Sequence, residues 1–365
     1  MSGVFYFIVS LLVLALMIFI HELGHYTAGR ILGFKILDFS IGFGPALFQF
    51  KKKDINYALR AIPLGGACRF YGEEDEPIDA VSFNSQKPLK RLIVIFAGPL
   101  MNFVLAYVLA VVMLLCYGDQ KVDKYANGDY AIVINAVSED SPAERAGLME
   151  GDIIISVGGN DISGEPHEYE DKIEIVSKSI DEAPAEGVAL IVLRDGVQKE
   201  IFVSDIFNEK ADKNLVGITM GAYRRFVRRG FFSAFGGGFE LMGDIVKSTF
   251  TAIANGFKNG FNQGDVSGVV GTVVITMKMA SMGFYNLLFV MIIISMSLGI
   301  MNLLPILPLD GGHLLFDFIE LVFGKPVPRK LQSILSVIGI FLLIVLMIYA
   351  TVSDIRGLFN GMFNW

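Results

Sequence analysis

The sequence has little charge and little cysteine. Only 18% of its 365 residues are charged, whereas globular domains average about 25%. Hydrophobic residues make up 53% of the chain, which excludes a disordered protein, a collagen and an ordinary soluble enzyme. The net charge of −7 argues against a general nucleic-acid binder. The two cysteines, Cys68 and Cys116, lie in or beside apolar segments, so we expect neither a disulfide framework nor a cysteine zinc site.

Long apolar runs are abundant instead. They predict transmembrane helices at 1–30, 91–117, 283–310 and 331–352. The first run could also be a cleaved signal peptide. We interpret it as a retained helix, because no Lys or Arg precedes it and no small-x-small cleavage pattern follows.

Basic residues in the short loops predict the orientation. Loop 31–90 is rich in Lys and Arg, and the loop between the last two helices carries Lys325, Arg329 and Lys330. Both loops should face the cytoplasm. Both termini and the long 118–283 segment should then be extracytoplasmic.

Two segments outside the helices have strand patterns. Segment 31–90 holds alternating apolar and polar residues around a KKKD turn, which predicts a membrane-associated β-hairpin or small sheet on the cytoplasmic side. Segment 125–208 has several strand-like runs and a short helix with Ser141 as its N-cap and Pro142 at its first position. We interpret this segment as one α+β domain, followed at 209–282 by a linker with an amphipathic interfacial stretch. The predicted fold class is therefore a polytopic α-helical membrane protein with one extracytoplasmic α+β domain.

An HExxH motif lies at the end of the first apolar run. Residues four apart share a helix face, so His21 and His25 can present both imidazoles to one divalent ion. Glu22 follows the first histidine and can act as general base toward water at that ion. Ionisable residues inside a membrane are costly and by default functional. The motif therefore predicts a catalytic zinc site.

Such a site needs a third protein ligand. Asp310 is the main candidate, because the predicted orientation brings it to the same side of the membrane as the histidine pair. His313 is an alternative, although we expect it to lie in the following helix. Asn302 and the prolines after it should interrupt the third helix, freeing groups that could hold an extended peptide or stabilise an oxyanion. A simple kink beside a polar asparagine is the alternative. Farther along, Asp317 and Glu320 are typical of a solvated helix face.

Taken together, these motifs resemble the site-2 protease family of intramembrane zinc metalloproteases, peptidase family M50. The similarity is greatest to its bacterial regulator-of-sigma-E protease branch. The matching segments follow the family's order: HELGHYTAGR, SIGFGPAL, AIPLGG, FNSQKPLKRLIVIFAGPLMNFVLA and NLLPILPLDGGHLLF. The segment NAVSEDSPAERAGLMEGDIIISVGGNDI resembles a bacterial PDZ domain.

The resemblance implies a function and a set of site residues. It implies one Zn²⁺ per chain held by His21, His25 and Asp310, with Glu22 as base. It also implies that Asn302 and Pro305 contact substrate, and that a hairpin edge with Gly42, Phe43, Gly44 and Gly65 pairs with the substrate as an added strand. Expected partners are the lipid bilayer, single-pass membrane protein substrates, and a peptide or protein ligand of the PDZ domain. The expected substrates are anti-sigma factors and signal-peptide remnants, which this protein would cut after a first cleavage by another protease. The expected location is the bacterial inner membrane.

Three alternatives compete with this hypothesis. A non-catalytic membrane PDZ scaffold would not need Glu22 or a complete ligand set. A metal transporter would need a second polar constellation along a path, and the second and fourth helices offer none. A soluble zinc protease with a membrane anchor does not fit a motif that lies inside an apolar helix.

Overall fold

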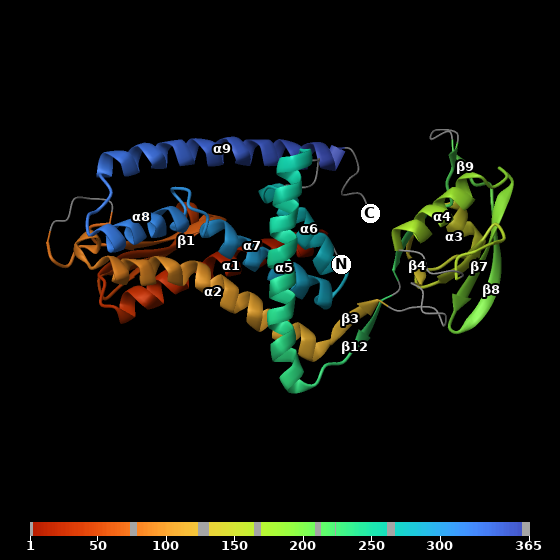
Figure 1. The fold of residues 1–365 in the computed structure, drawn as a ribbon, viewed down its shortest axis with the longest axis horizontal. Coiled ribbons are helices and arrows are strands. Elements are labelled where there is room, and N and C mark those ends of the chain that lie inside the picture. Colours follow the sequence, from red (N-terminus) through yellow and green to blue (C-terminus); the bar gives the residue numbers. More distant parts are fainter. Residues whose placement is uncertain are drawn as a thin grey trace. The chain divides into compact units, whose positions relative to one another are not determined.

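The computed structural model describes residues 3–73, 79–122, 131–163, 169–208, 213–222, 224–260 and 267–359. The chain forms two compact units, which we call the helical unit (Met1–Cys116 with Gly230–Trp365) and the sheet unit (Tyr117–Arg229). Figure 1 shows both units in a ribbon coloured by position in the sequence.

Within the described residues, four helices of the helical unit are long and apolar enough to cross a membrane. They are α1 (Gly3–Ile31), α2 (Pro88–Cys116), α7 (Phe284–Asn302) and α9 (Arg329–Phe359). The prediction of a polytopic membrane protein is confirmed. The third predicted helix is shorter than expected: α7 ends at Asn302, and a separate helix, α8 (Asp310–Phe323), begins at the aspartate. Pro305 and Pro308 lie in the connection, where their missing N–H groups do not interrupt a helical ladder.

Small residues let α1 and α2 approach closely. A side-chain carbon on Gly24 of α1 would collide with the backbone carbonyl of Ala97, and one on Gly98 of α2 would collide with the imidazole of His25. On the α7 side, the Ser295 hydroxyl donates a 2.8 Å hydrogen bond to the backbone carbonyl of Asn102. Close backbone contact and an interhelical hydrogen bond are the means by which helices associate in lipid.

The predicted β region forms a hairpin of β1 (Ile36–Lys52) and β2 (Ile55–Phe70). Its turn is formed by Lys53 and Asp54, both at positive φ. Both strands bend, so the first part of β1 pairs with both ends of β2, while the last part of β1 pairs only with the start of β2. One side of the hairpin contributes Phe39 and Phe70 to an apolar cluster that also contains Val94 of α2. The hairpin is thereby held against the helices.

The other helices of this unit are a short 3₁₀ helix (Phe83–Ser85), α5 (Phe231–Asn259) and α6 (Val269–Ser281). Helix α5 runs across α2 (Figure 1), where the ring of Tyr107 on α2 packs against that of Phe239 with centroids 4.4 Å apart. The buried carboxylate of Asp354, on α9, accepts hydrogen bonds from the backbone N–H groups of Gly268 and Gly271. These contacts cap the first turn of α6.

The sheet unit is built on an antiparallel sheet with strand order β11-β4-β5-β7-β8, and β6 pairs with β5. The strands are β4 (Ile132–Val137), β5 (Ile153–Val157), β6 (Asn160–Asp161), β7 (Gly187–Arg194), β8 (Val197–Ser204) and β11 (Ile218–Ala222). Helices α3 (Pro142–Ala146) and α4 (Tyr169–Asp181) contribute Ala143 and Val176 to its core. The Ser141 side chain accepts a hydrogen bond from the Glu144 N–H, and Pro142 lies at the start of the helix. The predicted capping is present.

The sheet unit extends beyond residue 208, where we expected a linker to begin. Strand β11 pairs with β4 along its length. Strand β12 (Arg224–Val227) pairs with β3 (Asp119–Val122) in a two-stranded ribbon at the ends of the unit, and β9 (Phe207–Asn208) pairs with β10 (Lys213–Asn214). All of these strands are short, and β11 and β12 pair with strands that lie far away in the sequence, so local patterning did not reveal them.

Candidate metal centre

The two histidines of the HExxH motif meet on one face of α1. Their Nε2 atoms are 3.2 Å apart, and their rings stand edge to face with centroids 4.8 Å apart. This is the arrangement that a four-residue helical spacing predicts. Two imidazole nitrogens are therefore directed at one point.

Asp310 brings the third ligand atom to the same point. Its Oδ2 lies 3.1 Å from the Nε2 of His21 and 3.5 Å from the Nε2 of His25. All three ligand atoms lie within 4.8 Å of one another. Asp310 is placed there because it is the first residue of α8, directly after the proline-containing connection. The structure thus brings together the three residues that the sequence suggested.

His313, the alternative ligand, lies in the first turn of α8 and lines the adjoining cavity. It is not part of the ligand cluster among the described residues. His167, the remaining histidine, lies outside the described residues.

The ligand atoms suit a shared cation. Asp310 Oδ2 is buried, and among the described residues no donor makes a hydrogen bond of ordinary geometry to it. A buried carboxylate oxygen without a donor is costly unless something positive compensates it. Two imidazoles and one carboxylate form a usual ligand set for catalytic zinc. The residues present therefore fit the metal.

Each histidine has a hydrogen-bonding group of α2 at its other ring nitrogen. The Nδ1 of His25 lies 3.0 Å from the backbone carbonyl of Val94. The Nδ1 of His21 lies 3.3 Å from the side-chain Nδ2 of Asn102. Such contacts fix the ring orientation of a ligating histidine.

Glu22 lies on α1 between the ligands and the hairpin, and its side chain is buried. The backbone of Cys68 on β2 faces its carboxylate. A side-chain carbon on Gly66 would collide with the Glu22 side chain, so this glycine lets the strand pass close to the acid. Burial raises the pKa of the Cys68 thiol, and Cys68 is not part of the His21, His25 and Asp310 cluster among the described residues.

A cavity of about 960 Å³ adjoins the cluster and includes His21, Glu22, His25 and Asp310 in its lining. Its other walls come from β2, the start of α2, α8 and the start of α9. The α9 residues are polar there: Gln332, Ser333 and Ser336. The lining of this cavity is partly polar, so water can occupy it beside the ligand atoms.

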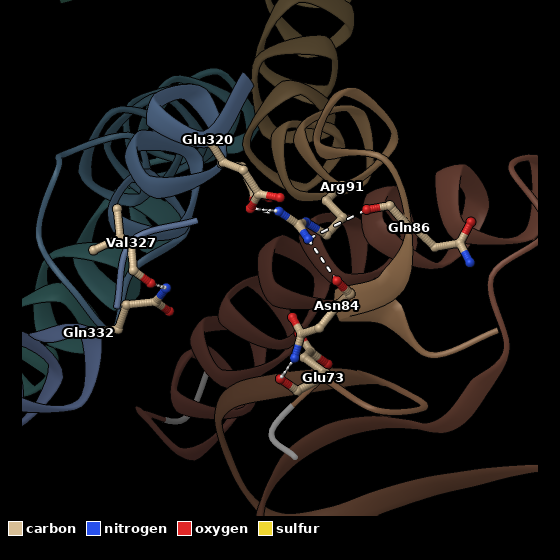
Figure 2. Close-up of polar contacts among 8 residues, drawn as sticks. Glu73, Asn84, Gln86, Arg91, Glu320, Val327 and Gln332 are labelled. Atoms are coloured by element: carbon tan, nitrogen blue, oxygen red, sulfur yellow. Dashed lines mark hydrogen bonds and ion pairs between the residues drawn. The ribbon is translucent and has the colours of Figure 1, made fainter. Parts of the chain in front are cut away.

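Arg91, which lines this cavity, connects α2 to α8 through its contact with Glu320 (Figure 2). Its guanidinium donates to Asp317 at 3.0 Å and to Glu320 at 2.5 Å, and to the backbone carbonyl of Asn84 at 3.0 Å. The side chains of Arg91, Asp317 and Glu320 are 6%, 13% and 22% exposed. The prediction of a solvated face at Asp317 and Glu320 was therefore wrong: both carboxylates are largely buried and paired with Arg91. No local pattern in the sequence indicates this pairing, because Arg91 lies more than two hundred residues earlier. Burial raises the pKa of Asp317 to about 6, although Arg91 opposes this.

The residues expected to contact substrate fall in two places. Gly42, Phe43, Gly44 and Gly65 lie where the hairpin bends, and all three glycines have positive φ. The ring of Phe43, a residue 55% exposed, lies where a side chain on Gly65 would be. Asn302 is the last residue of α7, and Pro305 is exposed in the connection to α8.

Comparison with known proteins identifies the group to which the chain is similar. Residues 9–346 match the model of peptidase family M50. A Campylobacter jejuni protein named as a zinc metalloprotease is 32% identical, with the alignment covering 96% of this chain and 93% of that protein. A similarly named protein of Clostridium acetobutylicum is 29% identical over 96% of this chain and 97% of its own length. The regulator of sigma-W protease RasP of Bacillus subtilis is 28% identical over 96% of this chain and 98% of that protein.

Proposed function

The chain belongs to peptidase family M50, and from this premise we propose that it hydrolyses peptide bonds in or near the transmembrane segments of single-pass membrane proteins. It is a zinc metalloprotease embedded in a membrane. The site assignment rests on one observation: the ligand atoms of His21, His25 and Asp310 lie within 4.8 Å of one another. The histidines come from α1 and the aspartate from α8, which are far apart in the sequence. Glu22, on the helix turn between the two histidines, completes the set.

In this proposal, His21, His25 and Asp310 hold the zinc ion. Zinc bound by three protein ligands supplies Lewis-acid chemistry, polarising a carbonyl oxygen and making water a stronger acid near neutral pH. The Glu22 carboxylate takes a proton from the attacking water and passes it to the leaving amine. Strand β2 passes close to that carboxylate at Gly66 and Cys68, and the partly polar cavity gives water access to it.

We propose that the substrate strand lies along the bend of the hairpin. A peptide bond inside a transmembrane helix is hydrogen-bonded and dry, so the segment must unwind before cleavage. An exposed strand edge offers replacement hydrogen bonds to the unwound backbone. The bend at Gly42, Phe43, Gly44 and Gly65 and the end of α7 at Asn302 and Pro305 are the positions proposed for this contact.

We further propose that the sheet unit is a PDZ domain on the extracytoplasmic side of a bacterial inner membrane, with both termini on that side. The capped helix α3 after β4, and the sheet completed by β11 after the β7–β8 hairpin, support this proposal. Such a domain would bind a peptide or exclude substrates with bulky outer portions, so cleavage would follow a first cut by another protease. Anti-sigma factors and signal-peptide remnants are the proposed substrates.

The test compares the full chain with Glu22→Gln in liposomes containing a single-pass substrate with a trimmed outer domain. Glu22→Gln should retain zinc and lose cleavage, whereas Asp310→Ala should lose both. Glu182→Gln makes the same chemical change as Glu22→Gln on an exposed surface and should behave as wild type. Cleavage by the Glu22→Gln variant, or full zinc content and activity in Asp310→Ala, would overturn the assignment.

A further inference from the structure

Asn102 is a polar residue in the middle of an apolar transmembrane helix. It is completely buried in α2. Its backbone carbonyl accepts a hydrogen bond from Ser295 of α7, which is also fully buried. A polar side chain at such a position is costly in lipid and by default has a function.

The side chain of Asn102 meets one ring nitrogen of His21. Its Nδ2 lies 3.3 Å from the Nδ1 of His21, while its Oδ1 is buried and has no hydrogen-bond partner among the described residues. The contact lies on the side of the imidazole opposite Nε2, the atom that faces Asp310. Asn102 is therefore placed to act on the ligand rather than on the metal.

The chemistry of a ligating histidine determines what this contact must be. When Nε2 holds a metal, the neutral imidazole carries its proton on Nδ1 and needs an acceptor there. His25 has such an acceptor in the backbone carbonyl of Val94. For His21, the Asn102 amide is the hydrogen-bonding group at Nδ1 within the described part of the chain.

We infer that Asn102 is a positioning residue of the metal centre, whose side-chain oxygen accepts a hydrogen bond from the Nδ1–H of His21. The inference rests on the proposed zinc site. It requires the Asn102 amide to turn by 180°, which exchanges two atoms of nearly equal size and moves no neighbour. Either orientation leaves one amide atom without a described partner, so the proton on His21 decides between them. With the oxygen accepting from the Nδ1–H, Nε2 carries no proton and its lone pair is available to a metal ion.

This role predicts a specific loss of zinc affinity. Partners of ligating histidines typically contribute 10–100-fold to metal affinity. Asn102→Leu removes the acceptor at similar volume, so its zinc Kd should rise by roughly 10–100-fold. Asn102→Asp keeps an oxygen at the same place and should remain within about threefold of wild type, as in carboxylate–histidine–zinc triads.

Ser295→Ala is the matched packing control, because it removes a buried hydrogen bond to Asn102 without touching the side-chain amide. The measurement is competition for Zn²⁺ between the full chain in detergent and a chromophoric chelator. Circular dichroism and gel filtration check that each variant is folded. Ser295→Ala should bind zinc within about threefold of wild type, because it leaves the His21 partner in place.

Three results would overturn the inference. The first is wild-type affinity in Asn102→Leu, the second is an equal loss in Ser295→Ala, and the third is a loss in Asn102→Asp as large as that in Asn102→Leu. His21→Ala separates this inference from the proposed function. If His21→Ala binds zinc as tightly as wild type, the metal site itself is wrong and both fail. If only His21→Ala loses zinc, the site stands and the role of Asn102 falls.

Discussion

Replacing Arg91 with methionine would remove the cation that joins α2 to α8 while keeping most of the side-chain volume. Asp317 and Glu320 would then face each other without a partner in a largely buried position. Removing one partner of a buried ion pair typically costs about 3–5 kcal/mol. Because Glu320 is 22% exposed, water compensates part of the loss, and we expect a cost of about 3 kcal/mol.

A cost of this size is measurable as a change in thermal stability. For a unit of this size it corresponds to a fall in Tm of roughly 6–12 °C. Zinc affinity should fall as well, because α8 begins at Asp310 and Arg91 holds that helix two turns later. The assay is thermal unfolding of the full chain in detergent, with zinc binding measured on the same samples.

The matched control removes the unpaired charges. Adding Asp317→Asn and Glu320→Gln to Arg91→Met leaves no buried charge, so the triple variant should regain most of the lost stability. A Tm within about 2 °C of wild type for Arg91→Met would refute the reasoning. So would a triple variant no more stable than the single one, since the cost would then lie in packing and not in charge.

Three further predictions concern other contacts. Although burial opposes it, hydrogen bonds from Arg194 lower the pKa of Asp152, so Asp152→Asn should destabilise the sheet unit by about 2–3 kcal/mol at pH 7. This stability is present above the unfolded pKa of about 3.9 and is lost as pH falls through the lower folded pKa, so wild type and variant should converge in an acid titration of unfolding. Gly24→Ala forces a methyl group against the backbone carbonyl of Ala97. It should reduce the free energy of unfolding by about 1–3 kcal/mol and lower both the Tm and the zinc affinity; an unchanged Tm would contradict the close helix contact. Asp354→Ala removes the cap of α6 and should cost about 1–2 kcal/mol by denaturant unfolding, whereas no change would mean that the cap is not formed.

The clustering of His21, His25 and Asp310 could be predicted from two local signals and the predicted orientation of the helices. A four-residue spacing places His21 and His25 on one helix face, and a carboxylate after a proline-rich helix end is an unusual feature of an apolar sequence. The long helices follow from composition alone. The orientation of the membrane unit and the identity of the soluble domain stay predictions.

The supporting contacts could not be predicted in the same way. The charge of Asp317 and Glu320 is typical of solvent exposure, and only the fold brings Arg91 to them. Strand β11 is short, and the strand with which it pairs lies some eighty residues earlier. Yet the sequence did contain a signal for two of the missed residues: an arginine and an asparagine in or beside a long apolar run are costly and need a partner.

Helix α2 supplies none of the three ligand atoms, and yet it contacts each of the elements that do. The backbone carbonyl of Val94 lies at hydrogen-bond distance from His25, and the side chain of Asn102 faces His21. Arg91 pairs with Asp317 of α8, the helix that begins at Asp310. Together with Gly98, against which the His25 ring packs, these residues are spaced three, four and four positions apart, which places them on one helix face. The ligands come from distant parts of the chain, so their convergence depends on a surface that both α1 and α8 contact. That face of α2 is the surface, and its arginine, glycine and asparagine make the contacts that an entirely apolar helix could not make.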